Sequence, residues 1–182
     1  MPAIFTIGHS TRAAGEFANL LAEHGVRQVA DVRRFPGSKR YPHFSAESMA
    51  PWLGAVGIAY VHLPELGGRR TPSAAASPNT FWRSASFRAY ADYMATDEFR
   101  AALARLEELA RQQPTAIMCS EAVPWRCHRQ LIADALATAL WQVTDIIGPG
   151  SSRPHAVNPH AQPQPDGTLI YRAEQQELFS DP

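Results

Sequence analysis

The chain of 182 residues is poor in cysteine, has no net charge, and lacks a long apolar run. Both of its cysteines, Cys119 and Cys127, fall in one short motif, so we interpret them as free thiols and not as a disulfide framework. A formal net charge of +0 argues against a global electrostatic attraction to nucleic acid or to a membrane surface. No apolar run is long enough to cross a bilayer, and MPAIFTIGHS has no basic leader. We therefore expect a cytoplasmic protein that makes no membrane contact.

Short apolar runs alternate along the chain with patterns of helical period, which is typical of βαβ units. This alternation predicts an α/β fold: a three-layer sandwich built on a mostly parallel, open, Rossmann-like sheet of about five strands. The expected strands are Ala3–Ile7, Gln28–Val32, Ile58–His62, Thr115–Cys119 and Gln142–Ile146. The expected helices are Ala13–His24, Ala46–Val56, Ser84–Met94, Asp97–Gln112 and Trp125–Leu140.

The composition changes after Gly148. Residues 1–148 read as a single α/β domain, whereas residues 149–182 read as a Pro-rich, extended tail with a short strand at TLIYR. Near its end the tail carries Gln175, Leu178 and Phe179, in the spacing of the short motif that binds the bacterial sliding clamp. A sliding clamp is therefore one expected partner. The alternative is that Leu178 and Phe179 pack back on the domain.

Polar side chains gather where the predicted strands end. In an open parallel sheet the carboxyl ends of the strands share one edge, and ligands bind there. We therefore expect a common polar rim that binds a small anionic or nucleotide-like ligand. The residues that we assign to ligand binding are Ser10, Asp31, Arg33, Arg34, Arg126 and Arg129.

The segment MCSEAVPWRCHR is the centre of this rim. Cys119 is the candidate nucleophile, because a nearby arginine, an imidazole and a helix start favour a thiolate. His128 is the candidate general base or acid, and Glu121 the group that orients it or carries a second proton. His9 completes the catalytic set from the first strand, and Cys127 is given a supporting role, with an ordinary core position as its alternative.

A metal site is a second interpretation of the same segment. Cys119, Cys127 and His128 are all metal-binding residue types, but the paired CxxC spacing is absent. Further ligands such as His9 or His155 would have to come from elsewhere in the chain. We therefore assign no metal ligand and no cofactor at this point.

Four motifs, TIGHSTR, DVRRFPGSKRYPHF, HLPELGGRR and MCSEAVPWRCHR, together resemble the bacterial and archaeal family called domain of unknown function 488. The resemblance extends from about Ile4 to the tail. It implies an α/β domain and a shared polar site, and it supplies no reaction. The matching positions that it singles out are His9, Ser10, Asp31, Arg33, Cys119, Glu121, Cys127, His128 and Arg129.

Two functional hypotheses follow. The first is an enzyme, a thiol-dependent hydrolase or transferase, that acts on a phosphorylated or nucleotide-like ligand at the rim. The second is a non-catalytic, nucleic-acid-associated binding module, recruited to DNA replication or repair through its clamp-binding tail motif.

Overall fold

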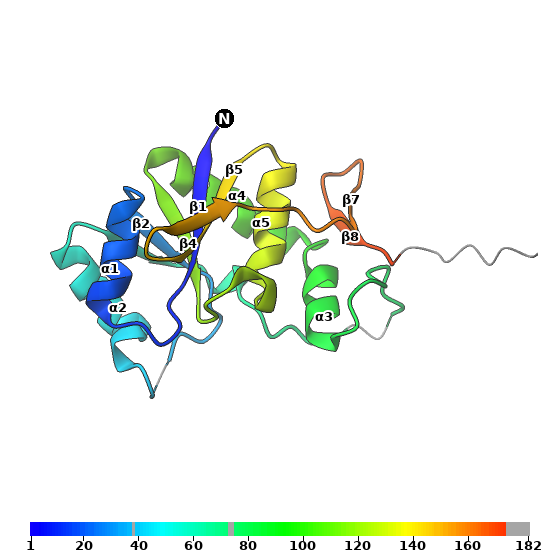
Figure 1. Ribbon diagram of the computed structural model, residues 1–182. Helices are drawn as coiled ribbons and strands as arrows, with labels where there is room; N and C mark the ends of the chain where they lie inside the picture. The colour runs from blue at the N-terminus through cyan, green and yellow to red at the C-terminus, as the bar shows by residue number, and fades with distance from the viewer. Residues whose placement is uncertain (38, 73–74, 174–182) are drawn as a thin grey trace, which may run out of the picture.

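The computed structural model of the protein describes residues 1–37, 39–72 and 75–173. Its centre is a six-stranded sheet in the order β3-β2-β4-β1-β5-β6. Figure 1 labels β2, β4, β1 and β5 of this sheet. The strands are β1 (Ala3–Gly8), β2 (Gln28–Asp31), β3 (Ala59–His62), β4 (Thr115–Cys119), β5 (Gln142–Gly148) and β6 (Ser151–Pro154). All of them pair in parallel except β6, which is antiparallel to β5. The mostly parallel α/β sheet predicted from the sequence is confirmed.

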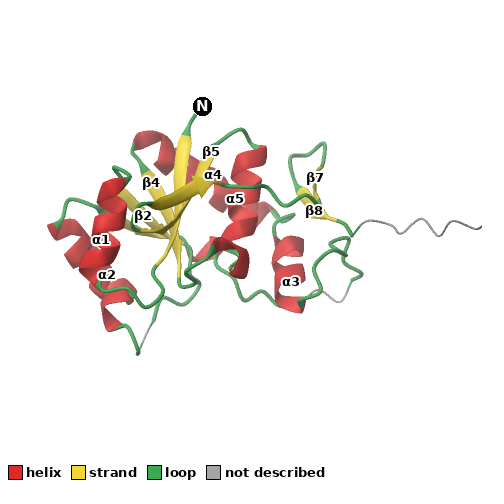
Figure 2. Ribbon diagram, viewed as in Figure 1, coloured by secondary structure: helices red, strands yellow, loops and turns green. Residues whose placement is uncertain are grey.

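Helices cover both faces of the sheet, which gives the predicted three layers (Figure 2). One face packs against α1 (Ala14–Glu23) and α2 (Ala46–Ala55), and the other against α4 (Asp97–Gln112) and α5 (Arg129–Thr138). The helix α3 (Ala85–Tyr93) adds to the second of these cores from the side. Short 3-10 turns follow three strands, at Pro42–Phe44, Pro64–Leu66 and Pro124–Arg126. Each turn has a proline in its first positions, where the missing N–H costs nothing.

Strand β4 shows how the sequence builds two cores. All five of its residues are buried, as expected for a central parallel strand that is covered on both faces. Ala116 and Met118 enter the core with α1 and α2, whereas Ile117 and Cys119 enter the core with α4 and α5. Because successive side chains alternate between the faces of a strand, this register directs the Cys119 side chain toward α5.

The start of α5 differs from the prediction. The sequence predicts one helix from Trp125 to Leu140, but the structure has a 3-10 turn at Pro124–Arg126 and a helix that begins only at Arg129. Cys127 is the break, since its backbone is extended, with φ −137° and ψ 147°. The side chains of Cys127 and His128 therefore come from a bend and not from a regular helical face.

The segment after Gly148 lies against the domain as far as the structure describes it. It adds β6 to the sheet, runs on to the short hairpin of β7 (Ala161–Pro163) and β8 (Leu169–Tyr171), and places Tyr171, fully buried, in the core with α5. The strand predicted at TLIYR corresponds to β8. Gln175, Leu178 and Phe179 lie outside the described residues, so the clamp-binding motif stays a prediction. In the part of the chain that is described, no helix is long and apolar enough to cross a membrane.

Candidate functional site

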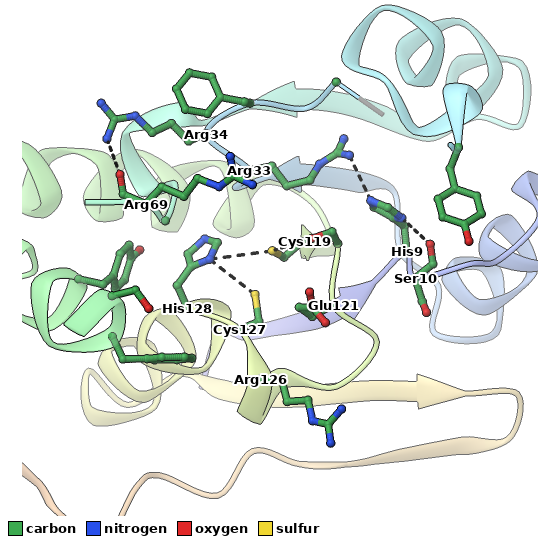
Figure 3. Close-up of a pocket in the computed structure, with 18 of the residues that line it drawn as sticks. His9, Ser10, Arg33, Arg34, Arg69, Cys119, Glu121, Arg126, Cys127 and His128 are labelled. Carbon is green, nitrogen blue, oxygen red and sulfur yellow. Dashed lines mark hydrogen bonds between the residues drawn. The ribbon is translucent and has the colours of Figure 1, made fainter. Parts of the chain in front are cut away.

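A pocket of about 770 Å³ opens at the carboxyl ends of β1, β2 and β4 (Figure 3). Gly8 brings two of these ends together: a Cβ on Gly8 would lie 1.7 Å from the Glu121 carbonyl oxygen, so only glycine permits this approach. The His9 N–H then donates to the Cys119 carbonyl at 3.0 Å, and the Ser10 N–H to the Ser120 carbonyl at 2.9 Å. The ends of β1 and β4 therefore form one continuous wall.

Two thiols and one imidazole meet at the floor of this pocket. The Nδ1 atom of His128 lies 3.9 Å from the Cys119 Sγ and 3.6 Å from the Cys127 Sγ (Figure 3). Cys119 is 5% exposed and Cys127 3% exposed, yet both line the pocket together with His128. The structure thus brings together the three reactive residues that the sequence places at the end of β4 and before α5.

The tautomer of His128 follows from its backbone partner. The Nε2 atom lies 3.0 Å from the Val32 carbonyl oxygen, and a carbonyl can only accept, so Nε2 carries the hydrogen. In the neutral ring, Nδ1 is then the acceptor, and it faces the two sulfurs. The residue that follows β2 thus orients His128 so that its Nδ1 lone pair can take a proton from a thiol or bind another electron-pair acceptor.

The two thiols differ in acidity. A hydrogen bond from Cys127, with His128 and the Arg129 guanidinium as further contributors, lowers the pKa of Cys119 well below its ordinary value. Burial raises the pKa of Cys127 well above its ordinary value. Of the two, Cys119 is the thiol that ionises first.

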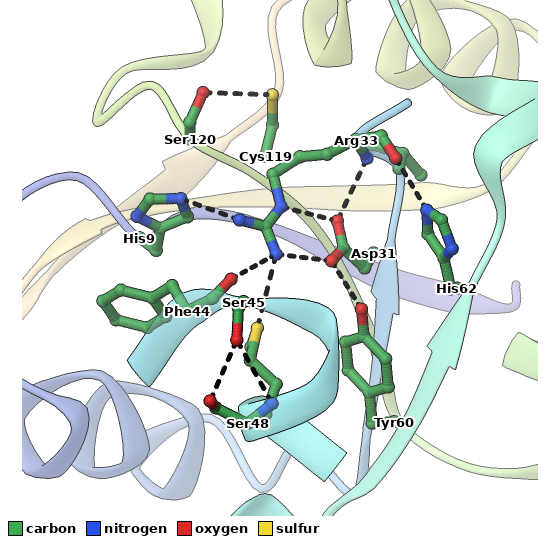
Figure 4. A network of polar contacts seen from close by, with 12 residues as sticks. His9, Asp31, Arg33, Phe44, Ser45, Ser48, Tyr60, His62, Cys119 and Ser120 are labelled. Carbon is green, nitrogen blue, oxygen red and sulfur yellow. Dashed lines mark hydrogen bonds and ion pairs between the residues drawn. The ribbon is translucent and has the colours of Figure 1, made fainter. Parts of the chain in front are cut away.

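Behind the floor lies a buried ion pair that fixes His9 (Figure 4). The Arg33 guanidinium donates to both carboxylate oxygens of Asp31, at 2.9 and 2.6 Å, and to the His9 Nε2 at 3.2 Å. The His9 Nδ1–H donates to the Ser10 carbonyl at 2.9 Å, and burial lowers the pKa of His9, which keeps the ring neutral. Both nitrogens of His9 thus have protein partners, an arrangement that suits a positioning role.

Comparison with known proteins gives one match. Residues 13–136 match the family model described as "Domain of unknown function DUF488". The chain belongs to this family. No curated protein and no solved structure matches it. The match includes the motif of Cys119 to Arg129 and the ion pair of Asp31 and Arg33, whereas His9 and Ser10 precede it.

In this DUF488 member, the predicted ligand-binding residues do not all reach the pocket. Ser10, Arg33, Arg34 and Arg126 line it, and so does the predicted catalytic Glu121, an exposed residue on the wall. Asp31 is fully buried, and its carboxylate is occupied by Arg33 and by the Tyr60 hydroxyl at 2.7 Å. The structure therefore places Asp31 behind the pocket wall.

Arg129 is likewise absent from the lining. It is fully buried, and its Nη1 donates to the carbonyls of Ile7 at 2.6 Å and Glu121 at 3.3 Å, which ties the loop after β4 to β1. Its Nε and Nη2 atoms have no hydrogen-bond partner among the described residues. The charge of Arg129 therefore lies beneath the thiols and does not face a ligand in the pocket.

Sequence reasoning missed several wall residues. Arg69 lines the pocket with a left-handed backbone, φ 59°, and Ser10 opposite has φ 49°. Non-glycine residues in this region are uncommon and concentrate at functional sites. Gly68 lies against His128, and Arg40 and Phe87 are also in the lining. Gly68 and Arg69 belong to the motif HLPELGGRR, but only the fold shows that this motif lines the pocket beside His128.

Proposed function

We propose that this DUF488 protein is an enzyme that acts on a phosphorylated or nucleotide-like ligand in the pocket. The observation that carries the proposal is the charge of the lining, which holds five arginines and a single carboxylate, that of Glu121. An excess of guanidinium groups over carboxylates favours an anion, and phosphate matches the two-pronged donor geometry of arginine. The arginines are Arg33, Arg34, Arg40, Arg69 and Arg126.

Four of these arginines are positioned to meet a ligand. Arg33 is neutralised by Asp31, but Arg34, Arg40, Arg69 and Arg126 are exposed. Within residues 1–37, 39–72 and 75–173, none of the four takes part in an ion pair with a carboxylate. Their positive charge is therefore available to a ligand from solvent.

Aromatic rings beside the arginines support a nucleotide-like ligand. Phe35 is 68% exposed, with the Arg34 guanidinium 5.7 Å from its ring centroid, and Tyr41 and Phe87 also line the pocket. Aromatic faces next to arginines suit a stacked base joined to phosphate groups. The reactive groups would come from the floor, where Cys119, Cys127 and His128 meet, and from Glu121 on the wall, as in a hydrolase or transferase.

The test is a binding measurement on the full chain. Isothermal titration calorimetry with pyrophosphate and with nucleoside diphosphates should give saturable binding that weakens with salt, because the arginines are exposed. The double variant Arg34→Gln/Arg69→Gln should lose about tenfold or more in affinity, since hydrogen bonds to charged groups contribute roughly 1.5–3 kcal/mol each.

Arg105→Gln is the matched control, because Arg105 is an exposed arginine of α4 that is not in the pocket lining. It should bind as the wild type does. Phosphorus NMR of the same ligands, incubated with the protein, then reports turnover. Equal affinity of the wild type and the double variant, or no binding of any phosphorylated ligand, would contradict the proposal.

A further inference from the structure

We propose that Cys119, Cys127 and His128 form a zinc site whose fourth coordination position opens into the pocket. The inference uses the proposed function for one point only, the phosphorylated or nucleotide-like ligand that would lie next to the metal. The site itself rests on the geometry of the three side chains. It replaces the nucleophilic role that the sequence suggests for Cys119 with a role as a metal ligand.

The distances fit tetrahedral zinc. The Cys119 Sγ, the Cys127 Sγ and one ring nitrogen of His128 all lie within 4.8 Å of one another. With Zn–S bonds of about 2.3 Å and Zn–N bonds of about 2.0 Å, a tetrahedron needs about 3.5 Å between nitrogen and sulfur. The structure has 3.6 and 3.9 Å for these two separations. A tetrahedron also needs about 3.8 Å between the two sulfurs, so an adjustment of at most about 1 Å brings all three atoms within bonding distance of one ion.

The contacts around the three residues are those of a metal-ligand shell. The His128 Nε2–H donates to the Val32 carbonyl, which leaves the Nδ1 lone pair directed at the sulfurs. The backbone N–H of Arg129 donates to the Cys127 Sγ at 3.4 Å, a contact that stabilises a thiolate. Both hydrogen bonds orient the donor atoms without occupying the space between them.

Gly68 packs against the face of the His128 ring. A Cβ on Gly68 would lie 3.0 Å from Nδ1, 3.3 Å from Cγ and 3.5 Å from Cε1 of His128, so it would sit above the face of the ring. The glycine thus packs on the ring face while the in-plane lone pair of Nδ1 stays directed at Cys119 and Cys127. A larger residue at this position would have to displace the imidazole by a few tenths of an ångström.

Charge and ligand type select the metal. Two nearly buried thiolates would be costly as free anions, and one divalent ion cancels both charges. Two sulfur ligands and one imidazole suit Zn²⁺ rather than Mg²⁺ or Ca²⁺, which prefer oxygen. The missing CxxC spacing is no obstacle, because β4 supplies one ligand and the bend before α5 supplies the other two.

The position of the cluster indicates a catalytic rather than a structural metal. All three ligands line the pocket, as does Glu121, so the fourth position faces the arginines and the ligand that they would hold. Structural zinc is closed by four protein ligands, whereas catalytic zinc keeps one position for water or substrate. In such a position Zn²⁺ polarises a water molecule or a phosphoryl oxygen, and Glu121 is the available proton acceptor.

Elemental analysis tests the site directly. Full-length protein, purified without an affinity tag from cells supplied with zinc, should contain roughly one zinc per chain. After removal of zinc by a chelator, titration with Co²⁺ should produce thiolate-to-cobalt charge transfer and the strong visible bands of tetrahedral cobalt. Cys127→Ser and His128→Gln should each lose stoichiometric metal and weaken the charge-transfer band.

His9→Gln is the control, because His9 lines the same pocket but its two nitrogens are bonded to Arg33 and to the Ser10 carbonyl. It should keep the metal. If Cys127→Ser or His128→Gln fails to fold, the reactivity of the two thiols in the wild type still tests the site. Bound zinc should protect both thiols from modification by a disulfide reagent.

Wild-type protein without zinc that also shows no charge transfer with Co²⁺ would overturn the proposal, as would equal metal content in Cys127→Ser and His9→Gln. This result is distinguishable from a failure of the proposed function. If the proposed function is wrong, the wild type does not bind pyrophosphate, whatever its metal content.

Discussion

A buried histidine joins the C-terminal segment to the domain and makes its stability depend on pH. The two ring nitrogens of His155 lie 2.9 Å from an Asp134 oxygen on α5 and 3.0 Å from an Asp145 oxygen on β5. The histidine side chain is 3% exposed, and the two carboxylates are at most 1% exposed. Since both partners are acceptors, the ring must be doubly protonated to bond both.

These two carboxylates raise the pKa of His155 from 6.5 to about 9, against the opposing effect of its burial. Tyr171 and the Asn158 N–H also donate to Asp134, Thr6 donates to Asp145, and Arg129 contributes to the lowered pKa of Asp145. Because the folded pKa is the higher one, the stabilisation is complete below pH 6.5 and is lost as the pH rises through about 9. The difference corresponds to roughly 3 kcal/mol in the free energy of unfolding.

Urea unfolding of the wild type and of His155→Gln, followed by tryptophan fluorescence from about pH 6 to about pH 10, measures this contribution. The variant should be less stable by roughly 3 kcal/mol at the acid end, and the gap should shrink toward the alkaline end. His160→Gln is the control, because the His160 ring bonds the Arg172 carbonyl and not a carboxylate. A gap between wild type and His155→Gln that stays constant over the whole range would refute the reasoning.

Three further predictions concern the site and the tail. Gly8→Ala should destabilise the protein by several kcal/mol in urea unfolding, because its Cβ would meet a backbone oxygen at 1.7 Å. Asp31→Asn should cost about 3 kcal/mol, since it leaves the Arg33 charge, 7% exposed, without its buried partner; unchanged unfolding midpoints would contradict this. In a pull-down with the bacterial sliding clamp, Leu178→Ala/Phe179→Ala should lose recovery relative to the wild type, and equal recovery would remove the recruitment hypothesis.

The fold could be predicted because its signals are local. Each central strand is a short apolar run, such as Thr115–Cys119, and each helix repeats its apolar residues with helical period. The alternation of strands and helices then predicts that the strands run parallel, which places their carboxyl ends at one edge of the sheet. The sixth strand was not predicted, because Ser151–Pro154 has four exposed residues and no apolar alternation.

The candidate site could be predicted only in part. The sequence predicts that Cys119, Cys127 and His128 lie close together, because β4 and the start of α5 are close in sequence, and the structure places their donor atoms within 4.8 Å of one another. Arg69 could not be placed beside them, because its position depends on how the segment after β3 crosses the sheet edge. The same limit applies to Arg129: its residue type suggests a ligand contact, whereas its burial beneath the thiols depends on the packing of α5.

The sequence by itself determined the order of strands and helices along the chain, the apolar faces that build the two cores, and the polar residues at one edge of the sheet. These features depend on periodicity and composition, which are properties of neighbours along the chain. The tertiary structure alone decided the direction of each polar side chain. In the tertiary structure Asp31 and Arg129 point inward, Arg34, Arg40, Arg69 and Arg126 are open to solvent, and the lone pair of His128 points at two sulfurs. Only the tertiary structure decides these directions, because they depend on contacts between residues far apart in sequence.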